Sequence, residues 1–200
     1  MMHDPATLAF YASEASAYVA KYRGQQSRDL AAFLDRLPNG ARVLELGCGG
    51  GGDTAAMLAK GVNVVPTDGS PKMAQLASEV LGVPVGVLLF EDLNEEQAYD
   101  GVWASACLLH VPVADLSTVL ASVRRALRAG GLFYASYKVG LGEGRDRLGR
   151  YYNYPTNEVL RAKYLAAGPW SSVELEEQQG GGYDDEPTQW MSVIARKAAG

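Results

Sequence analysis

The sequence has few cysteines, and the two that it has form no recognisable pattern. Cys48 lies in a glycine-rich stretch and Cys107 in an apolar run. Neither a disulfide framework nor a zinc-ligand spacing can be read from two such residues. We therefore expect a reducing, cytoplasmic environment and no metal site.

Long apolar runs and dense basic tracts are also lacking. No apolar segment approaches the ~18 residues that a membrane-spanning helix needs, and no basic segment followed by an apolar stretch opens the chain. The chain has 18 Lys and Arg residues against 23 Asp and Glu, a net charge of −5. This balance argues against a general affinity for nucleic acid or anionic membranes, so a small-molecule substrate is favoured.

What the sequence does have is enough apolar material for one sizeable core. Its 200 residues are 48% hydrophobic, which suits a single domain over residues 1–200. Nothing suggests a second domain, and we expect a monomer or a homodimer.

The chain is organised around a glycine-rich stretch. A short apolar strand is expected at Val43–Leu46, and after the glycines Asp53 or Thr54 can cap a helix. The glycines between them are Gly47, Gly49, Gly51 and Gly52. Without a Cβ, such a turn lets a ligand approach the main chain closely.

Glu45 indicates which ligand the glycines serve. Their spacing fits both the G-x-G-x-x-G dinucleotide pattern and G-x-G-x-G. A carboxylate two residues before the first glycine would repel a pyrophosphate, but it suits a ligand with an ammonium and a sulfonium. S-adenosylmethionine carries both charges. The alternative is that Glu45 only occupies a solvated strand end.

A second acid strengthens this interpretation. A strand expected at Val62–Pro66 ends near Asp68, which follows Gly47 by 21 residues (68 − 47). That is close to the ~20 at which an acid binds a ribose diol in βαβ nucleotide sites, and it disfavours a 2′-phosphorylated cofactor. Ser70-Pro71 starts the next helix, which places Met73 beside the adenine or in the core.

Two further strand ends supply candidate residues. A strand expected at Val83–Phe90 is followed by Glu91 and Asp92, either near the adenine or in a solvated loop. A central parallel strand is expected at 101–109. His110 follows it, near the edge where open α/β folds bind ligands, as a candidate base or as an ordinary structural histidine.

The two flanks of the chain are expected to cover this edge. Residues 4–37 look helical, with a second helix at about 27–37. Tyr11, Ala15, Tyr18 and Tyr22 share one face of the first part, either packed on the sheet or as a lid. After a helix at 115–127 and a strand at 132–137, the polar loop 138–150 is either merely solvated or binds substrate. Its cations are Lys138, Arg145, Arg147 and Arg150.

The pattern of the C-terminal part helps to decide between an S-adenosylmethionine site and a dinucleotide site. A helix is expected from about Thr156 to Ala167, and strands at 173–178 and 189–196 are joined by an acidic, glycine-rich connection. They should form an antiparallel hairpin, a feature that purely parallel dinucleotide folds lack.

Taken together, residues 8–197 resemble class I S-adenosylmethionine-dependent methyltransferases. The resemblance rests on VLELGCGGG (43–51), VVPTDGSPKM (64–73), YDGVWASACLLHV (99–111) and LRAGGLFYASYK (127–138). It is strongest with small bacterial enzymes acting on small molecules, including the tellurite-resistance type. It implies a Rossmann-like α/β fold, with a seven-stranded, mostly parallel sheet, helices on both faces and a C-terminal antiparallel hairpin. The implied regions are a helical lid (1–38), a cofactor-binding core (41–137) and a substrate region (138–200).

The resemblance also implies roles for individual residues. Glu45, Gly47, Cys48, Gly49 and Gly51 would hold the methionine part of S-adenosylmethionine, with Tyr11 and Tyr18 from the lid. Asp68 would bind the ribose, while Gly69, Ser70, Met73 and either Glu91 or Asp92 would surround the adenine. Ala104 and Ser105 would offer backbone groups to the methionine end.

The expected reaction is in-line methyl transfer to an unidentified small molecule, leaving S-adenosylhomocysteine. His110 would be the base if one is needed, and His110, Lys138, Arg145, Arg147 and Arg150 would contact the acceptor. Two alternatives stay open: a nicotinamide-dependent oxidoreductase and a non-catalytic module that binds S-adenosylmethionine.

Overall fold

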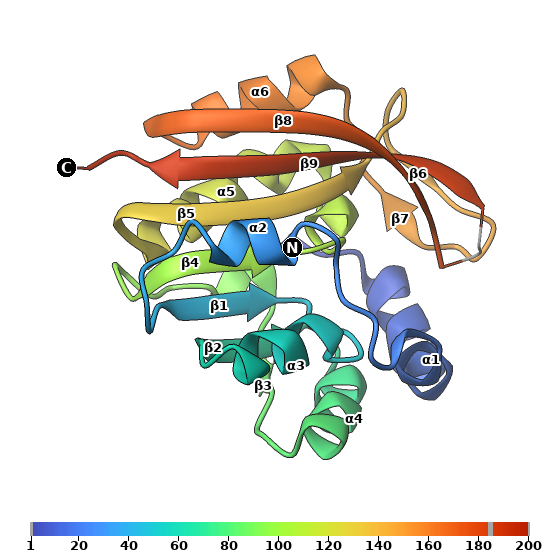
Figure 1. Ribbon diagram of the computed structural model, residues 1–200. Helices are drawn as coiled ribbons and strands as arrows, with labels where there is room; N and C mark the ends of the chain where they lie inside the picture. The colour runs from blue at the N-terminus through green and yellow to red at the C-terminus, as the bar shows by residue number, and fades with distance from the viewer. Residues whose placement is uncertain (1, 184–185, 200) are drawn as a thin grey trace.

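A seven-stranded sheet forms the centre of the protein (Figure 1). The computed structural model describes residues 2–183 and 186–199, and the strand order is β3-β2-β1-β4-β5-β9-β8. Neighbours from β3 to β5 run parallel, whereas β9 is antiparallel to β5 and to β8. The strands are β1 (Arg42–Leu46), β2 (Asn63–Asp68), β3 (Gly86–Val87), β4 (Tyr99–Ala104), β5 (Leu127–Lys138), β8 (Trp170–Gly181) and β9 (Pro187–Lys197). The predicted fold, with its C-terminal hairpin, is confirmed.

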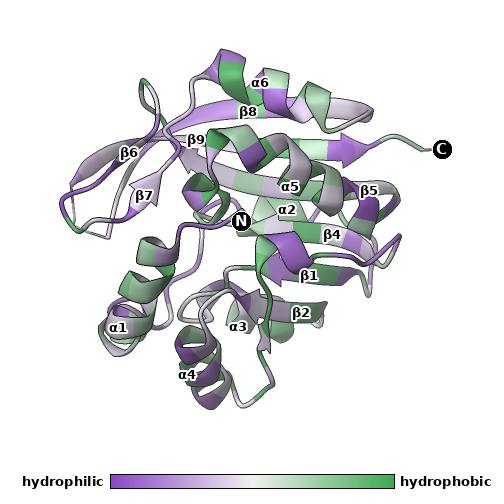
Figure 2. Ribbon diagram, turned by 180° about the vertical axis from the view of Figure 1, so that it is seen from behind, coloured by the Kyte–Doolittle hydropathy of each residue, from purple (hydrophilic) through white to green (hydrophobic). Residues whose placement is uncertain are grey.

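Helices cover both faces of this sheet. On one face α2 (Leu30–Leu34) and α3 (Gly52–Ala59) bury Phe33 and Met57 against β1, β4 and β5. On the other face lie α5 (Val113–Ala126) and α6 (Asn157–Ala166), which pack apolar stripes against β4, β5 and β9. Figure 2 shows apolar residues along β1 and β4 and a mixture of polar and apolar residues on α5 and α6. Each helix therefore buries one face and exposes the other.

Helix α1 (Pro5–Tyr22) lies beyond the carboxyl ends of the parallel strands (Figure 1). It packs against α4 (Pro71–Leu81), with Ala15, Val19 and Met73 as the small core between them. Both helices have proline in the first turn and a side-chain cap: Asp4 accepts from the Thr7 N–H, and Ser70 from the Met73 N–H. The N-terminal helix is thereby fixed over the edge where a ligand is expected.

Four local predictions are corrected. The second N-terminal helix, expected at about 27–37, is shorter and runs only from Leu30 to Leu34. The strand expected at 83–90 pairs only at β3, because this edge segment has β2 as its sole neighbour, and 3₁₀ helix η1 (Phe90–Asp92) follows it. The helix predicted to be capped by Asp53 or Thr54 is instead preceded by Gly51 in the left-handed conformation, without a side-chain cap.

The fourth correction concerns the central strand expected at 101–109. It ends at Ala104, and Ala106 has a φ of 50° before the 3₁₀ helix η2 (Leu108–His110). Cys107, Leu108 and Leu109 are buried without being in a strand. Hydrophobicity alone does not separate these two situations.

The polar segment 138–150 is partly ordered as a second, two-stranded sheet. Its strands are β6 (Gly144–Arg145) and β7 (Tyr151–Tyr152). Asp146 holds the turn, accepting from the Leu148 and Arg150 backbone N–H groups and from the Arg150 guanidinium. Among the described residues, no helix is both long and apolar enough to cross a membrane.

Candidate active site

A cavity with two adjoining lobes lies at the carboxyl ends of the parallel strands, under α1. The first lobe lies between α1, the glycine bend, Asp68, Met73 and the segment after β3. The second lobe extends from Glu45 and the start of α3 to β7 and the C-terminal hairpin. Gly47, Gly49, Tyr11, Tyr18 and His110 line both lobes. The two lobes therefore form one continuous hollow at the edge where open α/β folds bind ligands.

The glycine bend forms the floor between the lobes. Gly47, Gly49 and Gly51 have φ values of 69°, 54° and 78°, which favour glycine. A Cβ on Gly47 would lie 2.6 Å from Cys107 Cβ, and one on Gly49 would lie 3.0 Å from the Tyr18 ring. The Cys48 N–H donates to the Thr67 carbonyl at 2.9 Å, which ties the bend to β2. The bend is thus a tightly packed main-chain cradle in which positions 47 and 49 require glycine.

Substitution of Gly47 tests this cradle. Gly47→Ala should destabilise the protein by about 1–2 kcal/mol from the left-handed backbone, and further from the overlap with Cys107. Gly61→Ala is the matched control, because its φ is 73° and nothing lies within 4 Å of the added Cβ. We expect Gly47→Ala to have the lower midpoint in urea unfolding and to bind S-adenosylhomocysteine more weakly. Equal midpoints and affinities in the two variants would contradict the predicted overlap.

Asp68 is held at the end of β2 with its carboxylate at the first lobe. Its Oδ2 accepts from the Gly49 N–H at 3.0 Å, and its Oδ1 from the Ser70 N–H at 2.8 Å. Burial raises its pKa to about 6, although these two hydrogen bonds favour the ionised form. Gly69 and Met73 line the same lobe. The predicted ribose acid is therefore rigidly placed, with further lone pairs left to accept from a ligand.

Glu45 lies at the second lobe and is 2% exposed, so the solvated strand-end interpretation is wrong. The Thr54 hydroxyl donates to Glu45 Oε2 at 2.5 Å. Burial raises the pKa of Glu45 to about 8, and the nearby charges of Asp53 and Asp68 act in the same direction. A buried carboxylate among other acids favours a cationic ligand.

His110 is joined to Tyr11 of α1. Its Nδ1 lies 2.6 Å from the Tyr151 carbonyl, so this nitrogen carries the proton, and its Nε2 accepts from the Tyr11 hydroxyl at 2.9 Å. Burial lowers the pKa of His110 to about 4, so the ring is neutral near pH 7. Burial raises the pKa of Tyr11 to about 12. The structure thus brings Tyr11 of α1 and the predicted base together at the junction of the lobes.

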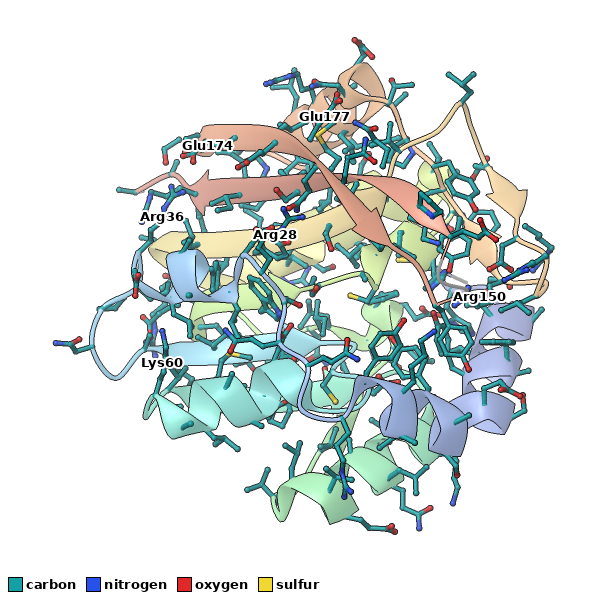
Figure 3. The ribbon with its side chains drawn as sticks, turned by 45° about the vertical axis from the view of Figure 1, so that its right-hand side comes forward. Arg28, Arg36, Lys60, Arg150, Glu174 and Glu177 are labelled. Carbon is teal, nitrogen blue, oxygen red and sulfur yellow. The ribbon has the colours of Figure 1, made fainter. Side chains whose placement is uncertain are left out.

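The four predicted substrate cations divide into two pairs. Lys138 and Arg150 line the second lobe and are 7% and 1% exposed. Figure 3 shows Arg150 beside α1 and the end of the C-terminal hairpin. Arg145 instead pairs with Asp4 at 2.7 Å on the surface, and Arg147 is exposed outside both lobes.

Several predicted cofactor residues do not line the cavity. Asp92 is exposed, and Glu91 binds His3 at 2.9 Å, because the 3₁₀ turn η1 directs both acids away from the first lobe. Gly51 and Ser70 shape the bend and the start of α4, and Ala104 is buried in β4. Cys48 and Ser105 do line the cavity.

Other lining residues had no clear signal in the sequence. The first lobe is closed by Leu88, Leu89 and Phe90, which belong to the segment that was expected to be a strand. Tyr152, Tyr183 and Trp190 reach the second lobe from β7 and the C-terminal hairpin. Asp53 also lines it and accepts from Ser27 and from the Trp103 indole. The one sequence signal for these residues is the cluster of tyrosines at 151–154, which includes Tyr152.

Comparison with known proteins finds a family that is similar to the part of the chain around the glycine bend. Residues 43–131, which include the glycine bend and Asp68, match the family described as a methyltransferase domain. Over this range the chain is similar to methyltransferase domains. It is 39% identical over 106 residues to ubiquinone biosynthesis O-methyltransferase from Xanthomonas axonopodis pv. citri, covering 50% of this chain and 44% of that protein. The chain thus spans about half the length of such curated relatives.

A solved structure is similar over more of the chain. 1,6-Didemethyltoxoflavin-N1-methyltransferase from Burkholderia thailandensis is 25% identical, has a TM-score of 0.71, and covers 95% of this chain and 88% of that one. It was crystallised with 1,6-didemethyltoxoflavin and S-adenosylhomocysteine. A methyltransferase from Methanosarcina mazei has a TM-score of 0.76 at 16% identity, covering 84% and 98% of the two chains, and shows the shared fold.

Proposed function

We propose that this protein transfers a methyl group from S-adenosylmethionine to a small organic acceptor bound in the second lobe. One observation carries the proposal: Glu45, which is buried, and Asp68, which is half-buried, face adjoining lobes on either side of the glycine bend. That arrangement suits a ligand with a ribose diol at one end and a cationic centre at the other. The similarity to the Burkholderia enzyme, whose structure holds S-adenosylhomocysteine, supports it.

The residues of this chain would divide the cofactor between the lobes. Asp68 would accept hydrogen bonds from the ribose hydroxyls, and the adenine would lie against Met73 and Leu89 in the first lobe. Glu45 would face the ammonium group near the start of α3. The sulfonium supplies the chemistry, since it makes its methyl group electrophilic. Residues 1–38 would act as the lid, through Tyr11 and Tyr18.

The protein's contribution to the rate would be alignment and exclusion of water. A methyl transfer needs the acceptor atom, methyl carbon and departing sulfur in line, and holding that geometry can contribute several kcal/mol. Tyr11 and His110 stand at the junction of the lobes, where the acceptor and the methyl would meet. They are therefore the groups of this chain placed to orient the acceptor.

The pairing of Tyr11 with His110 predicts non-additive kinetics. Tyr11→Phe and His110→Asn should each lower kcat/KM by roughly tenfold, because each disrupts the same 2.9 Å hydrogen bond. The double variant should be no slower than the slower single variant, as expected for two residues acting as one unit. Steady-state kinetics of the three variants measure this. If the losses in kcat/KM of the two single variants multiplied in the double variant, Tyr11 and His110 would act independently. An unchanged rate in His110→Asn would show that His110 is not a catalytic residue.

The proposed function is tested by ligand titration and turnover. Calorimetric titration should show micromolar binding of S-adenosylmethionine and S-adenosylhomocysteine and none of NAD. Incubation with a panel of phenols, carboxylates, amines, thiols and tellurite, read by mass spectrometry, should give a product heavier by one methylene. Binding of NAD alone would overturn the proposal in favour of an oxidoreductase. Cofactor binding without turnover across the panel would favour a non-catalytic binding module.

A further inference from the structure

The N-terminal segment forms one wall of the first lobe. His3, Asp4, Thr7 and Leu8 line this lobe, and none of them lines the second lobe. In the proposed function the first lobe holds the adenosine part of the cofactor, and its junction with the second lobe leads to the methionine part. We therefore expect the N-terminal wall to lie against the base.

Two of the three polar side chains in this wall are committed within the protein. Asp4 accepts from the Thr7 N–H and hydroxyl, each at 2.8 Å, and from the Arg145 guanidinium at 2.7 and 3.0 Å. The Thr7 hydroxyl also accepts from the Tyr151 N–H at 2.8 Å. Asp4 thus caps α1 and pairs with β6, while Thr7 ties α1 to β7. His3 is the third polar side chain.

His3 is held in place by Glu91 of η1. Its Nδ1 lies 2.9 Å from Glu91 Oε1, and the two side chains are 17% and 24% exposed. Burial opposes ionisation of Glu91, but the hydrogen bond from His3 holds the pKa of this carboxyl below its ordinary value. The ionised carboxylate can only accept, so Nδ1 donates. In the neutral imidazole Nε2 then carries a lone pair.

The Nε2 atom of His3 has no hydrogen-bond partner among residues 2–183 and 186–199. The apolar side chains of the same lobe are Leu8, Met73, Leu88, Leu89 and Phe90. Apolar walls hold a flat base, but they distinguish poorly between two bases of the same shape. His3 supplies a side-chain acceptor that can make this distinction.

We propose that His3 recognises the adenine of the cofactor, with Nε2 accepting a hydrogen bond from the 6-amino group and Glu91 fixing the tautomer that allows it. This rests on the proposed function. His3 thereby selects a 6-aminopurine over a 6-oxopurine, because an oxo group would place two acceptors opposite each other. Glu91 is a positioning residue that acts through His3, which gives a role to an acid that does not itself line the cavity.

S-Adenosylhomocysteine and S-inosylhomocysteine test the inference, because they differ only at purine positions 1 and 6. Calorimetric titration at pH 8 gives the Kd of each, and the ratio of the two measures the preference for the 6-amino group. We expect the parent to bind the adenosyl compound at least about tenfold more tightly. His3→Phe keeps an aromatic ring without an acceptor, so it should lower the ratio by about tenfold.

A matched pair of variants tests the role of Glu91. Glu91→Leu should lower the ratio by about threefold or more, because the His3 ring is no longer fixed. Asp92→Leu should leave it unchanged, since Asp92 is exposed outside the cavity. A merely structural effect would weaken the binding of both compounds equally and would not move the ratio. Thermal unfolding shows whether each variant is folded.

The outcomes separate this inference from the proposed function. Equal binding of the two compounds by the parent, or the same ratio in the parent and in His3→Phe, would overturn the recognition by His3. An unchanged ratio in Glu91→Leu would overturn the positioning role of Glu91. The proposed function would stand in these cases, because S-adenosylhomocysteine still binds. A parent that binds neither compound would overturn the proposed function and this inference with it.

Discussion

Asp68→Asn should weaken the binding of S-adenosylmethionine and S-adenosylhomocysteine by about 100-fold. The carboxylate is fixed by the Gly49 and Ser70 N–H groups, so its remaining lone pairs are the acceptors offered to a ribose diol. An amide replaces one acceptor oxygen with a donor and removes the charge. Losing one charged hydrogen bond and weakening a second costs about 3 kcal/mol, which corresponds to about 100-fold in Kd. Calorimetric titration measures this.

The control for this experiment is Asp92→Asn. Asp92 is also an acid at a strand's carboxyl end, but it is exposed and lies outside the cavity. We expect its affinity for either ligand to be unchanged within a factor of two. Thermal unfolding without ligand would show that both variants fold. An Asp68→Asn protein that is folded and binds S-adenosylhomocysteine normally would contradict the proposed cofactor site.

Glu45→Gln should raise the stability of the cofactor-free protein at alkaline pH. The pKa of Glu45 is about 8 in the folded protein against an ordinary value of 4.5. Between these values the folded state holds a proton that the unfolded chain releases, so the free energy of unfolding falls as pH rises. The full difference corresponds to an upper limit of about 5 kcal/mol. The variant avoids this loss, and we expect it to melt about 5–10 °C above the parent at pH 8.5.

The pH dependence provides the control for this prediction. At pH 5 Glu45 is protonated in the folded protein and close to its ordinary pKa in the unfolded chain, so parent and variant should melt within about 2 °C of each other. The pKa of Asp68 is also raised, but Asp68 is present in both proteins, so its contribution to the melting difference cancels. If the difference in melting temperature between Glu45→Gln and the parent did not grow from pH 5 to pH 8.5, ionisation of the buried Glu45 carboxylate would not be its cause.

The same substitution should weaken cofactor binding. A cation near Glu45 favours the ionised carboxylate, so the parent's affinity for S-adenosylhomocysteine should rise by up to about tenfold per pH unit between pH 6 and 7. Glu45→Gln should lose this dependence and bind more weakly at pH 7.5. Glu45 would thus lower the stability of the cofactor-free protein and at the same time strengthen cofactor binding.

Some of the site could be predicted from sequence because its signals are local. The glycine bend follows from backbone conformations that favour glycine, and Asp68 follows from its spacing after that bend. Ser70 caps α4, as the following Pro71 suggests. Glu91 and Asp92 were placed in the adenine site for their position after a strand. That strand pairs over only two residues, and the turn that follows directs their side chains elsewhere. Short edge segments carry little periodicity from which to predict such a turn.

The sequence by itself determined the order of strands and helices, the antiparallel C-terminal hairpin and the two acids that flank the glycine bend. Each of these follows from periodicity, turn residues or spacing within about 30 neighbouring residues. Only the tertiary structure decided which side chains from distant segments meet over that bend. The hydrogen bond of Tyr11 to His110 spans 99 residues, and Lys138 faces Trp190 through strand register. Such contacts depend on how helices and strands pack, and a single sequence does not encode that packing in any local pattern.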